Sequence, residues 1–549
     1  MPSGASPLPA TTKDGGASFA STVKQKAWKL GSSGGFTAGQ TFERATGFVP
    51  FTNTPHFSSV PTYTSLKARK PASVNGAGDR SSHAQNEVSG RPAALIVAAI
   101  RSKPSASFTG EAKRTRSMRW PASAFKPAEY WNTPGMKAYP PGVKSTVELI
   151  ASDQGVTPET IKVGFLVSNL GGLGPAGSAA LELREDFEEV VDAYVAHVNA
   201  NGGVAGRKLE HVKVESDPVN ASSQQAACIR MTTDEKVFAV FDTASTLGVA
   251  QNCYAQKGVI LTTTASQTNS EQNFQRNGGM LASSGSSQNR VLLNWADLAL
   301  AAGYIGPGKG KLGILSTECA PDPEAIDGAF KPYLQQLGVE YLDVRVSCDL
   351  AAAQQQVGGA VLQFRQAGVD RVLPSAIFVT VNNYLQAAEA QQYRPTYFCS
   401  DMWGMCLDIF TRNFPRAQWA DTRGFTFSHS GEDKAGAPLS PAVQRCSDIL
   451  VEAGLPGVTE QMGKDAGAVA ICDSFFLWVT AMRNAPPNPR RADFPAALAA
   501  VGDQWQSPYA NIARFGAGKF NGGDDYAPVQ WLGDCQCHTQ TGPRVTVKH

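Results

Sequence analysis

The sequence lacks any run of about 18 consecutive apolar residues, the length that a membrane-spanning helix requires. It also lacks a Cys-x-x-Cys pair and contains only seven histidines, so the usual spacings of zinc and thiol-redox sites are missing. Charged residues make up 17% of the chain and hydrophobic residues 42%. This composition excludes a bilayer-spanning chain and indicates a globular protein. At 549 residues it is longer than one core usually supports, so we expect two or more lobes.

The net charge of +2 hides an asymmetry along the chain. Residues 1–120 contain 16 Lys and Arg but only 5 Asp and Glu, which leaves 33 basic and 42 acidic residues for the remainder. This first segment is rich in Ser, Ala, Gly and Pro and has no sustained helical or strand period. We therefore predict a disordered, low-complexity tail over residues 1–155. We interpret it as solvated, with no nucleic-acid partner, because no nucleic-acid-binding fold accompanies its basic residues.

All ten cysteines lie between Cys228 and Cys537. An even number of cysteines without metal-site spacing favours disulfides and an oxidising compartment. Pairs that are close in sequence, such as Cys228 with Cys253 or Cys399 with Cys406, could form, but the sequence leaves the connectivity open. Residues 1–30 contain no apolar core of a signal peptide, and the only candidate, residues 92–100, starts far from the N-terminus. The cysteines nevertheless favour an extracytoplasmic location.

Strands and helices alternate regularly from residue 161 onward. The first set of expected strands is 161–167, 212–215, 237–241 and 258–261, and the expected helices between them are 183–198, 222–234 and 245–256. The same alternation restarts after Gly306, with strands at 311–315, 339–346, 369–373 and 396–399, and helices at 324–337, 351–367 and 381–391. Regular alternation predicts parallel sheets with helices on both faces.

We therefore expect an α/β fold with two doubly wound parallel-sheet lobes joined by a hinge. Three later helices complete the lobes, at 441–453, 465–484 and 493–501, and a β-ribbon over 512–531 closes the fold. The expected boundaries are residues 156–305 with 423–500 for the first lobe and residues 306–422 with 501–549 for the second.

A ligand site is expected where parallel strands end, because ligands of open parallel sheets bind outside the carboxyl ends of the strands. The loops after the strands are 168–177, 242–246, 263–267, 316–322, 374–380 and 400–403. Five of these six loops carry small hydroxyl residues before a helix, where they can bind a carboxylate or simply cap the helix. From the opposite lobe, Asp401 could face an ammonium group and Trp403 could form an apolar wall.

Three segments of the chain resemble type I periplasmic solute-binding proteins, the receptors of ABC importers for leucine, amides and urea. They are Gly155 to Gly164, Val198 to Arg207, and the turn Thr264-Ala265-Ser266. The resemblance covers about residues 155–549 and rests on the order of these segments rather than on any one of them. It implies two lobes, joined by three crossings of the chain, that close on a small solute.

By position, the resemblance implies a carboxylate-binding loop at 242–246, chiefly Ser245 with Ala244, and a second hydroxyl-bearing turn at 264–267. It implies that Asp401 receives a ligand amino group and that Phe378 forms an aromatic wall. With the residues expected from the strand ends, the candidate ligand-binding set is Asp242, Ala244, Ser245, Thr246, Thr264, Ala265, Ser266, Gln267, Thr317, Phe378, Asp401 and Trp403.

The sequence departs from the family pattern at Ala320-Pro321-Asp322, where a Tyr-Gly pair is usual, and residues 171–175 contain no aromatic residue. The many hydroxyl groups favour a small polar metabolite, such as an amino acid or an amide, over a leucine-like solute. We expect a monomeric solute-binding protein that delivers this metabolite to a membrane permease, without enzymatic activity, cofactor or metal.

Two alternatives stay open. One is a ligand-sensing receptor domain of the same fold that takes no part in transport. The other is an NAD-dependent enzyme, because Gly172, Gly174 and Gly177 match the dinucleotide-binding pattern G-x-G-x-x-G after a strand. Pro175 interrupts that pattern, and the acidic residue that should follow arrives only at Glu215, about twice the expected interval.

Overall fold

The computed structural model describes residues 147–169, 181, 183–243 and 248–549. The chain divides into a unit of residues 1–111, which lies outside these ranges, and a unit of residues 112–549, to which the whole description refers. The expected tail lies outside the described residues except for its last positions. No helix within the described ranges has both the length and the apolar character that crossing a membrane requires.

The first sheet contains five parallel strands in the order β2-β1-β3-β4-β5. Their bounds are β1 Thr160–Ser168, β2 Lys208–Ser216, β3 Ala239–Asp242, β4 Ile260–Thr263 and β5 Leu281–Ala282. Every residue of β3 and β4 is buried, as expected for strands covered by helices on both faces. Because β2 and β3 lie on opposite sides of β1, the winding direction reverses there, and a crevice is expected at the carboxyl ends of β1 and β3.

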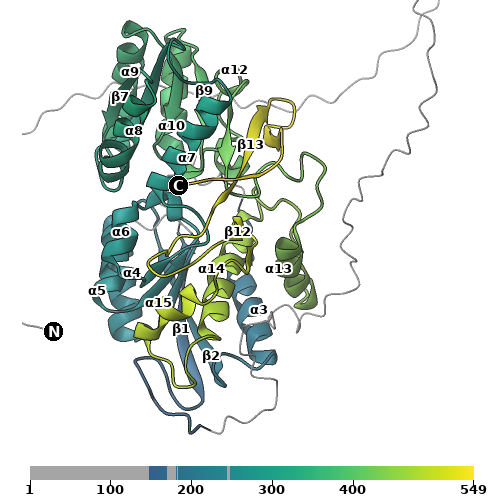
Figure 1. The fold of residues 1–549 in the computed structure, drawn as a ribbon. Coiled ribbons are helices and arrows are strands. Elements are labelled where there is room, and N and C mark those ends of the chain that lie inside the picture. The colour runs from purple at the N-terminus through teal and green to yellow at the C-terminus, as the bar shows by residue number, and fades with distance from the viewer. Residues whose placement is uncertain (1–146, 170–180, 182, 244–247) are drawn as a thin grey trace, which may run out of the picture. The chain divides into compact units, whose positions relative to one another are not determined.

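Helices cover both faces of this sheet (Figure 1). α4 (Ala221–Ile229) and α5 (Gly248–Gln256) pack together on one face, and α3 (Phe187–Ala200) and α14 (Ala466–Met482) lie on the other. α14 is apolar on all sides, and its residues from Ala468 to its end are buried, as this pattern predicts. Its Phe475 ring packs against Phe165 and Phe241, with ring centroids 5.4 and 5.1 Å away, and so anchors α14 on β1 and β3.

The second sheet contains eight strands, and its main path runs β14-β13-β10-β9-β8-β6-β7, with β15 paired to β13. The bounds are β6 Lys311–Thr317, β7 Tyr341–Val346, β8 Val369–Pro374, β9 Thr396–Cys399, β10 Arg423–Thr426, β13 Asp525–Leu532, β14 Cys537–Gln540 and β15 Val545–Thr546. The strands from β7 to β10 are parallel to one another, whereas β13 and β14 are antiparallel to their neighbours. The expected α/β class with two parallel-sheet lobes is confirmed.

Helices also flank the second sheet. α9 (Leu350–Gln366) and α10 (Phe378–Ala390) pack on each other, and α8 (Lys331–Gln336) packs with the helical turn Pro323–Phe330. α7 (Gln288–Ala301) packs on the same turn and on β10. The remaining helices are α6 Glu271–Arg276, α11 Asp408–Thr411, α12 Arg416–Trp419, α13 Pro441–Glu452 and α15 Phe494–Ala499. α13 packs on α3 and α14 and therefore belongs to the first lobe.

The packing differs from the expected lobe boundaries in the region before residue 306 and again near residue 423. α7 lies within residues 156–305, but its Trp295 indole donates a hydrogen bond to the Cys399 carbonyl oxygen at 3.1 Å, so α7 packs on the second sheet. β10 pairs with β9 and β13 and also belongs to that sheet. Gly424 makes this pairing possible, since a Cβ atom there would lie 2.1 Å from the Cys399 carbonyl oxygen.

The expected ribbon over residues 512–531 forms in part. β12 (Asn511–Ala513) pairs with β11 (Trp505–Ser507), which packs on α13 and α14 of the first lobe. A narrow hairpin follows, with bridges from Ala513 to Gly523 and from Gly516 to Lys519. β13 then joins the second sheet instead of extending the ribbon. The segment expected in the second lobe thus begins in the first lobe and ends in the second.

The chain passes between the lobes three times: after β5, after β10, and between β12 and β13. Backbone hydrogen bonds tie the first and third crossings together, from the Gly522 N–H to the Ser283 carbonyl at 3.0 Å and from the Gly523 N–H to the Gly285 carbonyl at 3.2 Å. Arg544 donates to the Phe427 carbonyl oxygen of the second crossing at 3.2 Å and to the Asp525 carbonyl oxygen of the third at 3.3 Å. The three crossings therefore form one connected hinge region.

All ten cysteines of the chain lie in the described part and form five disulfides. They are Cys228–Cys253, Cys319–Cys348, Cys399–Cys406, Cys446–Cys472 and Cys535–Cys537. The two pairs anticipated from sequence proximity are among them. One disulfide joins α4 to α5 and another joins α13 to α14, so they connect neighbouring helices of the first lobe.

Removing the disulfide between α13 and α14 with Cys446→Ala and Cys472→Ala should lower the free energy of unfolding by about 3 kcal/mol, because it closes a long loop. These cysteines are separated by 26 residues, whereas Cys535 and Cys537 are separated by 2. The matched double variant at 535 and 537 should lose about half as much. Thermal unfolding under non-reducing conditions compares the two, and an equal or reversed order would contradict this ranking.

Candidate functional site

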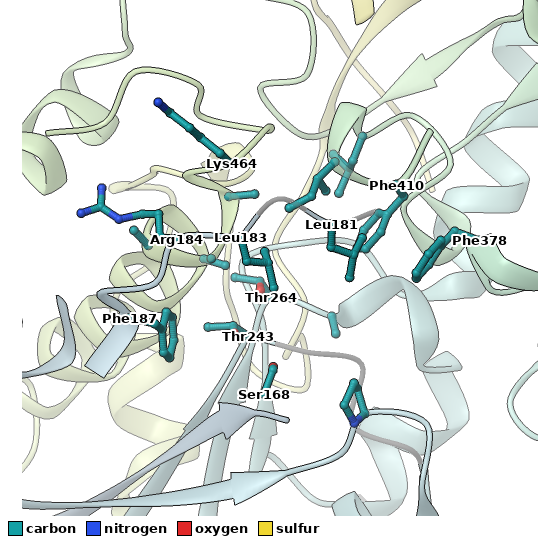
Figure 2. A pocket seen from close by; sticks show the side chains of 18 of the residues that line it. Ser168, Leu181, Leu183, Arg184, Phe187, Thr243, Thr264, Phe378, Phe410 and Lys464 are labelled. Carbon is teal, nitrogen blue, oxygen red and sulfur yellow. The ribbon is translucent and has the colours of Figure 1, made fainter. Parts of the chain in front are cut away.

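Three hydroxyl residues stand at the carboxyl ends of neighbouring strands in the first sheet. Ser168 is the last residue of β1, Thr243 directly follows β3, and Thr264 directly follows β4. All three line a cavity of about 210 Å³ (Figure 2). In the described part of the chain, none of the three hydroxyl groups makes a hydrogen bond to another residue. The cavity thus lies where the reversal of strand order between β1 and β3 predicts a ligand site.

The walls of this cavity are mostly carbon and come from both lobes. The second lobe contributes an apolar wall, which consists of Ile377, Phe378, Trp403, Leu407, Ile409 and Phe410. The rings of Phe378 and Phe410 are stacked, with their centroids 5.2 Å apart. The apolar residues of the first lobe include Val167, Leu181, Leu183, Phe187, Val219, Ala466 and Ala470. Figure 2 shows Phe378 and Phe410 on one side of the cavity and Phe187 on the other.

The charged residues of the lining are both cations. Arg184 is held by ion pairs to Asp186 at 2.7 Å and to Asp465 at 3.1 Å. The hydrogen bond with Asp186 is the main cause that raises the pKa of Arg184. Lys464 is exposed, makes no ion pair within the described ranges, and points away from the other labelled side chains in Figure 2. No described lining residue is Asp or Glu, and the charge of Arg184 is already balanced by Asp186 and Asp465.

The structure brings four of the twelve candidate residues to the cavity: Thr264, Ala265, Phe378 and Trp403. Phe378 begins α10, and Trp403 lies in a short turn with φ of 51°. Ala244, Ser245, Thr246 and the side chain of Gln267 lie outside the described residues, so their assignment stays a prediction. The four residues that line the cavity come from both lobes, as the hinge arrangement predicts.

Two further candidates of the first lobe lie close to the cavity but outside its lining. Asp242, the last residue of β3, is buried and accepts a hydrogen bond from the Thr263 hydroxyl at 3.4 Å. Ser266 is buried against the first crossing, where a Cβ atom on Gly285 would lie 2.1 Å from its hydroxyl oxygen. Both side chains therefore face the protein interior.

Thr317 at the end of β6 faces Asp322 instead of the cavity. Its backbone N–H and its hydroxyl both donate to Asp322 Oδ2, at 2.9 and 2.7 Å. Asp322 is fully buried and also accepts a hydrogen bond from Gln288. Burial raises the pKa of Asp322 to about 6, although hydrogen bonds from Thr317 and Gln288 act in the opposite direction. The hydroxyl of Thr317 is thus already used within the second lobe.

Asp401 follows β9 and contacts the start of the second crossing. Its Oδ1 accepts a hydrogen bond from the Thr426 hydroxyl at 2.8 Å, and its Oδ2 accepts one from the Phe427 N–H at 2.6 Å. The carboxyl group is buried and does not line the cavity. Burial raises its pKa to about 6, against the hydrogen bonds and the charge of Arg544. In this structure Asp401 fixes the chain at the hinge, and it is not placed to receive a ligand amino group.

Part of the apolar lining was not anticipated from the sequence. The spacing of Leu183 and Phe187 predicted the buried face of a helix over 183–198, but α3 begins only at Phe187. Leu183 lies before the helix and lines the cavity with Leu181. Leu407 and Phe410 were not identified either, because the segment after β9 has no periodic pattern. Its position depends on a long-range hydrogen bond from the Ile409 N–H to the Met462 carbonyl oxygen at 3.2 Å.

The fold and the cavity define a class: a two-lobed binding protein in which three chain crossings connect the lobes and the ligand site lies between them. Residues 160–536 match the family model of periplasmic binding proteins. Because this match covers more than half of the chain, the protein belongs to the periplasmic binding protein family. The resemblance noted in the sequence is thereby confirmed. Membership implies a location outside the cytoplasm.

Solved structures of low sequence identity share the fold. A fatty acid ABC transporter substrate-binding protein from Thermomonospora curvata is 16% identical, with a TM-score of 0.53, and the match covers 72% of this chain and 95% of that chain. A leucine-binding protein from Thermotoga maritima is 12% identical, with a TM-score of 0.54 and coverage of 70% and 99%.

A third structure is a solute-binding protein of an ABC transporter from Rhodopseudomonas palustris, in complex with 3,4-dihydroxybenzoic acid. It is 14% identical, with a TM-score of 0.52 and coverage of 71% and 98%. These neighbours are all solute-binding proteins. Among curated proteins, none matches this sequence.

Because the pKa of Asp401 is raised, ionisation of its carboxyl group should destabilise the folded protein, and this effect should depend on pH. Its folded-state pKa of about 6 lies above the unfolded value near 3.9, so the stability it contributes is complete at low pH and is lost as the pH rises through about 6. When the pH rises from 5 to 7.5, ionisation of this group should lower the free energy of unfolding of the wild type by about 1 kcal/mol. The destabilisation caused by Asp401→Asn should therefore be about 1 kcal/mol smaller at pH 7.5 than at pH 5. Denaturant unfolding at both pH values measures this difference, and equal destabilisation would show that the pKa of Asp401 is not raised.

Proposed function

We propose that this protein is the extracytoplasmic solute-binding component of an ABC-type importer. It captures a small amphipathic metabolite between its two lobes and presents the closed form to a membrane permease. The observation that carries this proposal is the cavity itself, because its floor is built from strand ends of one lobe and its opposite wall from the other. Because both lobes complete the site, a solute makes all of its contacts only when the lobes come together.

The size and lining of the cavity favour a small solute with a substantial apolar part. A volume of about 210 Å³ lies below the roughly 300–1,000 Å³ typical of drug-sized ligands. Because the apolar wall offers mainly carbon atoms, a solute that is polar on all sides would lose its hydration there without replacement hydrogen bonds. We therefore propose an amphipathic solute instead of the polar amino acid or amide expected from the sequence. The ligands named for the similar structures, a fatty acid, leucine and a dihydroxybenzoic acid, fit this description.

The proposed mechanism is hinge closure. The solute first meets the hydroxyl groups at the strand ends of the first lobe, which bind its polar group. The apolar wall of the second lobe then covers the apolar part and removes its surface from water. Closure is favoured only by the additional contacts that the solute makes in the closed state. The protein performs no chemical step on the solute in this scheme, and we propose that it acts as a monomer without cofactor.

Ligand binding should raise the melting temperature, because a ligand that binds only the native state stabilises it. The screen should contain carboxylic acids, amino acids, amides and urea, and small-angle scattering should show a smaller radius of gyration for each compound that binds. Phe378→Ala removes part of the apolar wall and should weaken binding by about tenfold or more, since an aromatic side chain buries a large apolar area. Leu362→Ala, at an exposed position of α9 outside the lining, is the matched control and should leave the affinity unchanged.

The proposed function would be contradicted if no compound in this screen raised the melting temperature or altered the radius of gyration. It would also be contradicted if Phe378→Ala and Leu362→Ala had the same effect on the affinity.

A further inference from the structure

We propose that the cavity selects carboxylic acids that carry no amino group and discriminates against the corresponding amino acids. This inference rests on the proposed function and specifies the class of solute for the same site. It is supported by the absence of an acidic side chain from the described lining, by the existing partners of the nearby carboxylates, and by the position of the free hydroxyl groups.

The described lining offers no anionic partner to an ammonium group. Within the described ranges, the lining contains Arg184 and Lys464 but no Asp or Glu. An ammonium group enclosed here would lose its hydration and find no anionic partner, which makes its burial costly. A carboxylate needs no such partner, because the hydroxyl groups of the lining can donate hydrogen bonds to it.

Four described carboxylates near the site already have partners inside the protein. Both oxygens of Asp401 accept hydrogen bonds at the second crossing. Asp322 is bound by Thr317 and Gln288. Asp186 and Asp465 are paired with Arg184. For any of them to receive a ligand amino group, an interaction that holds the hinge, a strand end or the loop before α3 would have to break.

The free hydroxyl groups are suitable for a carboxylate. Ser168, Thr243 and Thr264 lie at the ends of three adjacent strands, and their hydroxyl groups have no other partner among the described residues. Each hydroxyl can donate one hydrogen bond to a carboxylate oxygen, and hydrogen bonds to an ionised group are the strong ones. On the opposite side of the cavity, the apolar wall offers contacts mainly to the carbon atoms of a ligand. The arrangement therefore matches a molecule with an acidic end and an apolar body.

Matched ligand pairs test the inference directly. Leucine and 4-methylpentanoate share one carbon skeleton and differ in the amino group, as do phenylalanine and 3-phenylpropanoate. Isothermal titration calorimetry on the full chain should show at least one of the two acids binding about tenfold or more tighter than its amino acid, because only the amino acid buries an unpaired ammonium group. The neutral amide 4-methylpentanamide should bind more weakly than the matching acid.

Two variants separate carboxylate recognition from a general effect on folding. Thr264→Val removes one hydroxyl with little change of shape and should weaken the preferred acid by about tenfold, whereas Thr264→Ser should restore its affinity. Circular dichroism and the melting temperature of both variants show whether they fold like the wild type. If Thr264→Val does not fold, Ser168→Ala serves in its place, with the same expected weakening.

The inference is overturned if neither acid binds more tightly than its amino acid, or if the amide equals the acid. In that case the proposed function stands, because a solute is still captured. If no solute of the broader screen binds at all, the proposed function itself fails. The two failures are therefore distinguishable in the same set of titrations.

Discussion

The structure depends on the order of the strands around β1. Because β2 and β3 lie on opposite sides of β1, and β4 follows β3, three adjacent parallel strands end at the same edge of the first sheet. Ser168, Thr243 and Thr264 come at these ends. Their hydroxyl groups have no partner among the described residues, and so they remain available to a ligand. The second lobe then needs only to supply an apolar cover over this edge.

The hinge region, which joins this cover to the first lobe, contains a set of buried charged side chains. Glu432 contacts His429 at 2.6 Å and Arg544 at 2.7 Å. Although burial acts to raise the pKa of Glu432, its interactions with His429 and Arg544 lower that pKa to about 2. Arg544 also donates a hydrogen bond to the Phe427 carbonyl oxygen, and the N–H of the same Phe427 donates one to Asp401. Buried charge pairs add little net stability, but they require one geometry, and here they fix the second crossing relative to the third.

Sequence reasoning predicted the strands well where a continuous apolar run is bounded by polar residues, as in β1 and β6, and the loop positions after them followed from the parallel topology. It placed Thr264 and Trp403 in the site for this reason, and the family resemblance placed Phe378 there. It did not predict the apolar wall around Leu407 and Phe410, because that segment is positioned by contacts with residues far away in the chain. For the same reason the local pattern could not show that Asp401 is held by Thr426 and Phe427.

The central claim is that the strand ends of the first lobe bind the acidic end of a solute and the second lobe covers its apolar end. A crystal structure of the protein with a bound carboxylic acid tests this most directly. The account predicts carboxylate oxygens within hydrogen-bond distance of the hydroxyl groups of Ser168, Thr243 or Thr264, and the carbon body against Phe378 and Phe410. A bound acid in the opposite orientation, or at a different place in the protein, would contradict it.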